Sequence, residues 1–187
     1  HGGGQRSGHD GLMPSSQASA QVPEIDDQTL GDVVFYAATL APAARRQPDD
    51  PQVLRGQALF AQAQCAACHR PAYLTGEPRF PRLTSHQVVG QRIWPYTDLL
   101  LHDMGEGLAD GRPDFLASGR QWKTPPLWGV GLFQDVNGHQ RLLHDGRANG
   151  VLEAVLWHGG EAQGAKDQVL KFSKQDRDAL VAFVNSL

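Results

Sequence analysis

Cysteine and methionine are scarce in this sequence, which has two residues of each among 187. A zinc site normally needs a second pair of ligands spaced like the first, and the chain has no further thiol to supply one. No run of eighteen apolar residues occurs, so the sequence predicts no membrane span. Lys and Arg number 17 against 20 Asp and Glu, and the net charge of −3 gives no sign of a nucleic-acid partner.

The composition otherwise describes a soluble globular protein, with 40% apolar and 20% charged residues. The first 20 residues are rich in Gly, Ser, Gln and His and lack the apolar stretch of a secretory signal. We therefore predict a flexible N-terminal arm at residues 1–24 and one domain at residues 25–187.

Apolar periodicity predicts helices separated by long Pro- and Gly-rich loops. No strand pair is predicted. The expected helices run from Leu30 to Leu40, from Pro51 towards position 65, over 96–102, from Val151 to Trp157, over 167–172 and from the Ser173 cap to Leu187.

The most informative motif is Cys65-Ala66-Ala67-Cys68-His69, because C-x-x-C-H is the attachment signature of c-type haem. The two thiols would form thioethers with one porphyrin, and His69 would bind its iron. The alternatives are a zinc half-site, a chance match and a thioredoxin-like redox pair, which would follow a strand rather than a helix. The motif and the loop-rich pattern together predict a mainly α, class I-like cytochrome c fold with long loop insertions around one covalent haem.

The second axial ligand decides what the iron can do. Met104 is the predicted ligand, because it follows an apolar Leu run and precedes a glycine, whereas Met13 lies in the arm. A carbonyl of the loop after His69, that of Pro81 by preference, is expected to orient the His69 ring. The competing ligands are the histidines at 86, 102, 139, 144 and 158, and a histidine would lower the reduction potential relative to methionine.

Four further segments carry a family resemblance. They are 96–105 (YTDLLLHDMG), 122–129 (WKTPPLWG), 143–148 (LHDGRA) and 157–162 (WHGGEA). In this order they resemble the C-terminal haem domain of the di-haem oxidoreductase ("thiol oxidoreductase") family, which is distantly similar to bacterial di-haem cytochrome c peroxidases. Family members usually carry a second CxxCH in an N-terminal domain that hosts the reactive haem, whereas this chain has one. The resemblance therefore implies the electron-transfer half of such an enzyme, with a further haem domain or another redox protein as its partner.

Several residues of these segments are candidates for the haem propionates, which favour cations and indole N–H donors. Lys123, Trp94 and Arg147 are assigned this role, with Trp128 as a further candidate, against the alternatives of surface cations and core aromatics. The triplet around Asp145 is interpreted as a turn into the next helix rather than as a catalytic group. Glu153 and Glu161 are interpreted as solvated helix residues, against an acid–base role.

Taken together, the residues predict a one-electron carrier whose iron is held by His69 and Met104, without catalytic side chains of its own. The alternative is a haem peroxidase or oxidase with an open or labile sixth position. A haem-bearing sensor or metal-handling module is a third possibility, suggested by the histidines of the arm. Because covalent haem attachment takes place outside the cytoplasm, a periplasmic or otherwise exported protein is expected.

Overall fold

The computed structural model describes residues 23–77 and 88–187, and the predicted mainly helical class is confirmed. Chain contacts divide it into a unit of residues 1–38 and a compact unit of residues 39–187. The first unit contains most of helix α1 (Asp27–Thr39), which buries none of its residues and starts where the Asp26 carboxylate accepts from the Thr29 N–H at 2.6 Å. The domain boundary expected after residue 24 stays a prediction.

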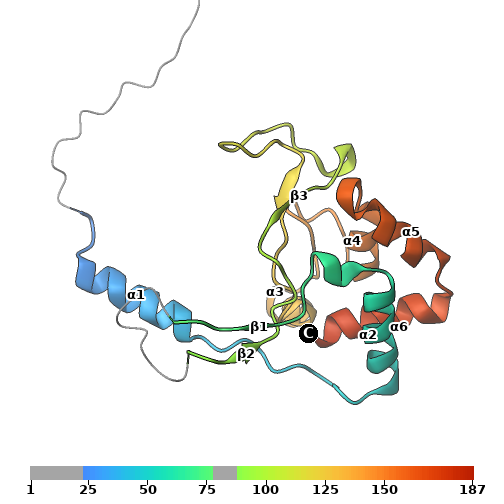
Figure 1. Ribbon diagram of the computed structural model, residues 1–187, viewed down its shortest axis with the longest axis horizontal. Helices are drawn as coiled ribbons and strands as arrows, with labels where there is room; N and C mark the ends of the chain where they lie inside the picture. The colour runs from blue at the N-terminus through green and yellow to red at the C-terminus, as the bar shows by residue number, and fades with distance from the viewer. Residues whose placement is uncertain (1–22, 78–87) are drawn as a thin grey trace, which may run out of the picture. The chain divides into compact units, whose positions relative to one another are not determined.

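Two crossing helices, α2 (Pro51–Gln62) and α6 (Lys174–Ser186), form the centre of the larger unit (Figure 1). The helix α2 begins as predicted, with Pro51 in its first turn and the Asp50 side chain accepting from the N–H groups of Gln52 and Val53. Close approach at the crossing depends on Gly56, because a Cβ there would collide with the backbone carbonyl of Ala179.

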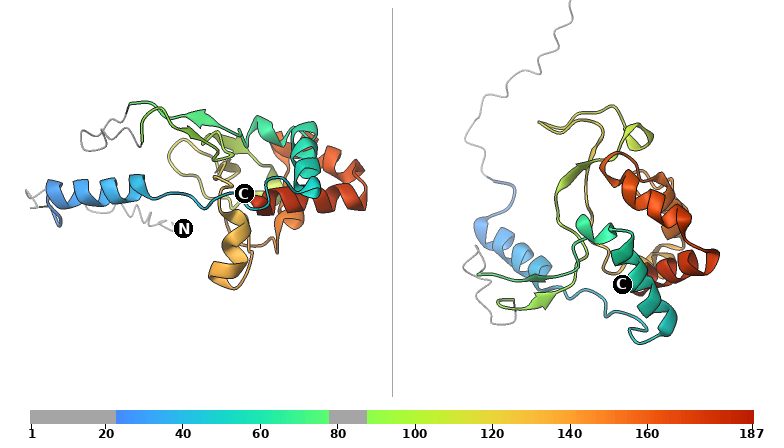
Figure 2. Two further views of the ribbon diagram at one scale, coloured as in Figure 1. Left: turned by 90° about the horizontal axis from the view of Figure 1, so that it is seen from below. Right: turned by 45° about the vertical axis from the view of Figure 1, so that its right-hand side comes forward.

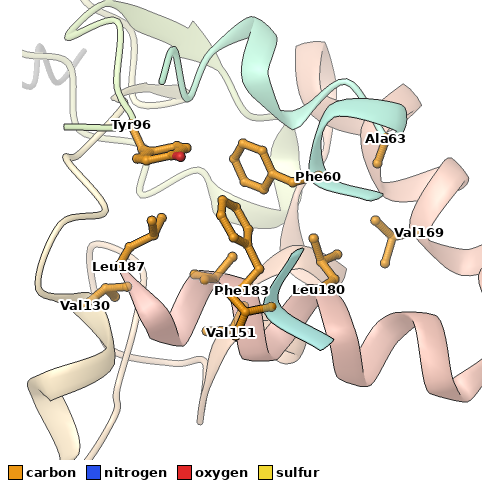
Figure 3. Packing of buried hydrophobic residues seen from close by; sticks show 11 residues of the cluster. Phe60, Ala63, Tyr96, Val130, Val151, Val169, Leu180, Phe183 and Leu187 are labelled. Atoms are coloured by element: carbon orange, nitrogen blue, oxygen red, sulfur yellow. The ribbon is translucent and has the colours of Figure 1, made fainter. Parts of the chain in front are cut away.

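Aromatic rings fill the space beside this crossing (Figure 3). The Phe60, Phe183 and Tyr96 rings meet edge to face, with centroids 5.3–5.9 Å apart. Each of these residues is at most 5% exposed. The core therefore joins α2 and α6 to the loop that contains Tyr96.

The other predicted helices are present. The helix α4 (Val151–Trp157) has the predicted bounds, whereas α5 (Gln163–Lys171) and α6 have shifted ends. These three helices lie together in the larger unit (Figures 1 and 2). Ser173 caps α6 as predicted, since its hydroxyl accepts from the Asp176 N–H at 3.1 Å. The short helix α3 (Phe133–Asn137), which follows a 3-10 turn at Val130–Leu132, was not predicted.

The sequence predicts no strand pairs, and this prediction is wrong. Two short antiparallel pairs form: β1 (Tyr73–Leu74) with β2 (Arg92–Ile93), and β3 (Leu101–Asp103) with β4 (Gln121–Lys123). In the second pair His102 lies opposite Trp122.

The helix predicted over 96–102 was also wrong. Tyr96 and Leu99 adopt positive φ angles of 53° and 61°, which a right-handed helix excludes. The side chains of Thr97 and Asp98 instead accept hydrogen bonds from backbone N–H groups two residues further on. The apolar run of Leu99, Leu100 and Leu101 that suggested a helix is more than half exposed.

Candidate functional site

The CxxCH motif directly follows α2, where Gln64 adopts a left-handed conformation with φ of 63°. Cys65 then begins a 3-10 turn (Cys65–Ala67), and the His69 N–H donates to the Cys65 carbonyl at 2.9 Å. This compact turn presents both cysteines and His69 to a common cavity. Both cysteines are free thiols.

The cysteines are poorly suited to thiolate chemistry. Burial raises the pKa of Cys65 to about 11, and burial also raises the pKa of Cys68. A thioredoxin-like pair needs a lowered thiol pKa to attack disulfides. The environment of the motif therefore disfavours that alternative.

The His69 ring is held by a single backbone contact. Its Nδ1 lies 3.0 Å from the carbonyl oxygen of Tyr96, and the Phe60 ring packs beside it. Burial lowers the pKa of His69 to about 4, so the imidazole is neutral at physiological pH. Because a neutral ring has one N–H, and the carbonyl takes it at Nδ1, Nε2 keeps its lone pair for a metal ion.

The orienting carbonyl thus belongs to Tyr96, which lies further along the chain than the expected loop. Pro81, the preferred candidate, lies outside the described residues. Tyr96 is held by its ring in the aromatic core, so the same residue connects the core to His69.

The cavity has a volume of about 510 Å³, within the ~300–1,000 Å³ typical of cofactor sites. Its walls come from the CxxCH turn, from β3 and β4, and from α4, α5 and α6. Leu108, Leu127, Leu142, Val151, Val155, Leu180 and Val184 contribute apolar surface. A flat apolar macrocycle would fit such walls, and Cys65, Cys68 and His69 are the residues of the wall that would hold it and its metal.

Met104 lies in the wall of this cavity, immediately after β3. Its N–H donates to the Arg120 carbonyl at 2.9 Å, and the adjacent Gly105 adopts a φ of 79°. Glycine is required there because a Cβ would come within 2.9 Å of the Gly160 nitrogen. The structure therefore brings Met104 to the predicted site, while leaving its role as a ligand a prediction.

A second candidate ligand, His158, lies in the same wall at the end of α4. Its Nδ1 is 2.7 Å from the Ala154 carbonyl, so its Nε2 is left with a lone pair, as in His69. Burial lowers the pKa of His158, which keeps the ring neutral. His69 and His158 thus both line this cavity.

The other histidines are less suited to the iron. His102 has both nitrogens 2.8 Å from carboxylates, those of Asp98 and Glu161, and the hydrogen bond with Glu161 is the main reason that the pKa of His102 is raised. His144 stacks on Trp122 with centroids 3.6 Å apart. His139 is outside the cavity wall, and His86 lies outside the described residues.

Of the three residues assigned to propionates, Lys123 is the one that lines the cavity. Arg147 donates to the Asp145 carboxylate at 2.6 Å and covers the Trp157 ring, and Trp94 is 54% exposed outside the cavity wall. Two cations of the wall were missed by the sequence analysis, Arg141 and Lys166. Nothing in their sequence neighbourhoods distinguishes them from surface cations.

The remaining polar residues of the motifs have structural contacts. Asp145 accepts from the Arg147 N–H at 3.2 Å, which closes the turn that leads towards α4. Trp128 is partly buried and lies outside the cavity wall. Glu153 accepts from the Asn149 N–H at 2.8 Å, at the start of α4.

Cys68, Asp98 and His102 offer ligand atoms within 4.8 Å of one another. A thioether at Cys68 would remove the thiolate that a metal ion needs there. We therefore interpret this cluster as polar contacts beside the second cysteine, where Cys68 and His102 line the cavity.

The family described as "Di-haem oxidoreductase, putative peroxidase" matches residues 6–187. No curated protein and no solved structure matched the chain. None of the helices among the described residues has the length and apolar character needed to cross a membrane.

Proposed function

The chain belongs to the di-haem oxidoreductase family, and on this basis we propose that it holds one haem c and transfers electrons one at a time. Cys65 and Cys68 would attach the haem, and His69 would bind its iron. The observation that carries the proposal is the His69 ring, which borders an apolar cavity with its Nδ1 fixed by the Tyr96 carbonyl and its Nε2 left for a metal.

The bound haem supplies one-electron chemistry through its iron. The protein contributes a fixed His69 ring and a mostly apolar cavity wall. The aromatic contacts of Tyr96 with Phe60 and Phe183 keep the orienting carbonyl in place. Little of this framework needs to move when the charge of the site changes, which favours electron transfer.

For the sixth ligand we propose His158, with Met104 as the alternative. Both lie in the cavity wall, and His158 also has the contact that orients a ligand histidine, from Nδ1 to the Ala154 carbonyl. Either residue would close the iron to small oxidants, so both are consistent with a carrier. A histidine would give the lower reduction potential.

Spectra of the purified ferric and ferrous protein test this assignment. We expect low-spin haem in both states, and haem that stays with the chain in a denaturing gel. His158→Ala should produce a high-spin ferric species, whereas Met104→Ala should leave the spectrum unchanged. Low-spin haem with an Fe(III)–methionine charge-transfer band that disappears in Met104→Ala would assign the ligand to Met104 instead.

A peroxidase is the second candidate function, because the family description names that activity. It requires an iron that peroxide can reach. A high-spin resting ferric spectrum, together with fast reaction with peroxide, would favour this function over electron transfer. The sequence contains one CxxCH, so we place the catalytic haem of a di-haem enzyme on a partner domain or protein.

The proposal also includes export of the protein, because covalent haem attachment takes place outside the cytoplasm.

A further inference from the structure

The His102 imidazole lies between two carboxylates from distant parts of the chain. Its Nε2 is 2.8 Å from Asp98 Oδ2, and its Nδ1 is 2.8 Å from Glu161 Oε2. Carboxylate oxygens accept hydrogen bonds, so each ring nitrogen faces an acceptor and the imidazole connects the two carboxylates. We call these three residues the carboxylate clamp.

Glu161 makes a second connection at the same place. Its other oxygen, Oε1, accepts from the Asp103 backbone N–H at 2.9 Å. The Asp103 carboxylate in turn accepts from the Gly105 N–H at 2.8 Å and from the Arg120 Nε at 3.2 Å. Glu161 therefore binds both the side chain of residue 102 and the backbone of residue 103.

The two segments that the clamp joins are in backbone contact. A Cβ at Gly160 would collide with the carbonyl oxygen of Asp103, and a Cβ at Gly159 would lie 3.0 Å from that of Met104. Segment 102–105 and segment 158–161 are thus packed without intervening side chains. These are the segments that carry Met104 and His158.

The clamp also borders the attachment site, because ligand atoms of Asp98, His102 and Cys68 lie within 4.8 Å of one another. From these contacts we infer that Glu161, His102 and Asp98 are positioning residues, which hold the segments of both candidate sixth ligands against the haem cavity and so keep the iron closed. This inference rests on the proposed function, because it concerns the same iron.

The test uses the haem-loaded protein and three variants. Glu161→Ala removes both connections, and Glu161→Gln keeps an oxygen for the Asp103 N–H while losing the carboxylate that His102 needs. Glu106→Ala is the matched control, since it removes a carboxylate from the same loop region, paired with Arg120, without a contact to His102. Haem content, the ferric spin state and the cyanide association rate are measured for each.

We expect full haem content in all three, an increased high-spin fraction in Glu161→Ala, and a cyanide association rate raised about fivefold, with a smaller rise in Glu161→Gln. The control should match the wild type. If Glu161→Ala fails to fold, Glu161→Gln carries the test with the same sign. Unchanged spin state and cyanide rate in a folded Glu161 variant would overturn the inference, whereas wild-type protein without haem, or with high-spin haem, would overturn the proposed function.

Discussion

His69 and Tyr96 are separated by 26 residues, and the Nδ1 of the first donates to the backbone carbonyl of the second at 3.0 Å. Tyr96 adopts a positive φ of 53°, and its ring is buried against Phe60 and Phe183. Packing of the ring therefore fixes the carbonyl in an otherwise unfavourable backbone conformation. The position of the proposed iron ligand depends on the hydrophobic core through this one residue.

Replacing Tyr96 should accordingly affect both stability and the iron. Tyr96→Ala removes a ring that is 4% exposed and should cost about 3–5 kcal/mol of unfolding free energy. The freed carbonyl should also broaden the spectroscopic signals of the His69-bound iron. Chemical denaturation and ferric EPR measure these effects, with Tyr96→Phe, which keeps the ring, as the control. A destabilised Tyr96→Ala variant with unchanged EPR would show that the carbonyl does not depend on the ring.

The crossing of α2 and α6 predicts a strong effect at Gly56. A Cβ at this position would meet the Ala179 carbonyl and lie 2.7 Å from the Phe183 Cβ. Neither atom belongs to a flexible side-chain end, so Gly56→Ala should force the helices apart and cost about 1–3 kcal/mol despite the better helix propensity of alanine. Thermal unfolding measures the loss. The exposed Gln62→Ala in the same helix should change stability by less than about 0.5 kcal/mol.

Elements whose ends are marked by local chemistry could be predicted from the sequence. Asp50 and Ser173 cap α2 and α6 because their side chains accept from N–H groups two or three residues away. The segment 96–102 could not be predicted this way. Its conformation is set by the burial of the Tyr96 ring and by the pairing of β3 with β4, and both depend on residues distant in the sequence.

The residues of the candidate site also differ in whether a local sequence signal predicts their positions. The motif determines the places of Cys65, Cys68 and His69, because their spacing is local. The contact between His102 and Glu161 spans 59 positions and has no local signal. His158 has a local signal, because a histidine at a helix end can donate to the carbonyl four residues earlier, as it does to Ala154.

The Ser173 cap supports a prediction at the start of α6. Ser173→Ala removes the acceptor of the Asp176 N–H and should lower stability by about 1 kcal/mol. For a chain of this size, that loss should reduce Tm by about 2–4 °C. Differential scanning calorimetry measures the shift. Ser173→Thr keeps a capping hydroxyl, and a loss as large as that of the alanine variant would argue against capping as the cause.

Asp176 should make stability depend on pH. The hydrogen bond from Arg55, followed by that from Ser173, holds the pKa of Asp176 below its ordinary value of 3.8. A carboxyl whose pKa is lower in the folded state stabilises the fold above its unfolded pKa and loses this contribution as the pH falls through the folded value. Asp176→Asn should therefore destabilise the protein at pH 7, and the difference from the wild type should shrink below about pH 4.

Urea denaturation at several pH values measures this difference. Asp178→Asn is the control, because it removes the same charge from the same helix without touching Arg55 or the Ser173 cap. A destabilisation by Asp176→Asn that is equal at pH 7 and pH 3.5 would exclude the electrostatic origin.

Lys123 provides a prediction about the reduction potential. Its side chain lines the cavity, where a positive charge favours the ferrous state, which carries one positive charge fewer than the ferric state. Lys123→Gln should therefore lower the potential. A partly screened interaction of about 1 kcal/mol corresponds to about 40 mV for one electron. Lys174→Gln, which removes an exposed cation from α6 outside the cavity wall, should shift the potential much less. Spectroelectrochemical titration distinguishes these results, and equal shifts in both variants would show that Lys123 acts through the net charge of the protein rather than from the cavity wall.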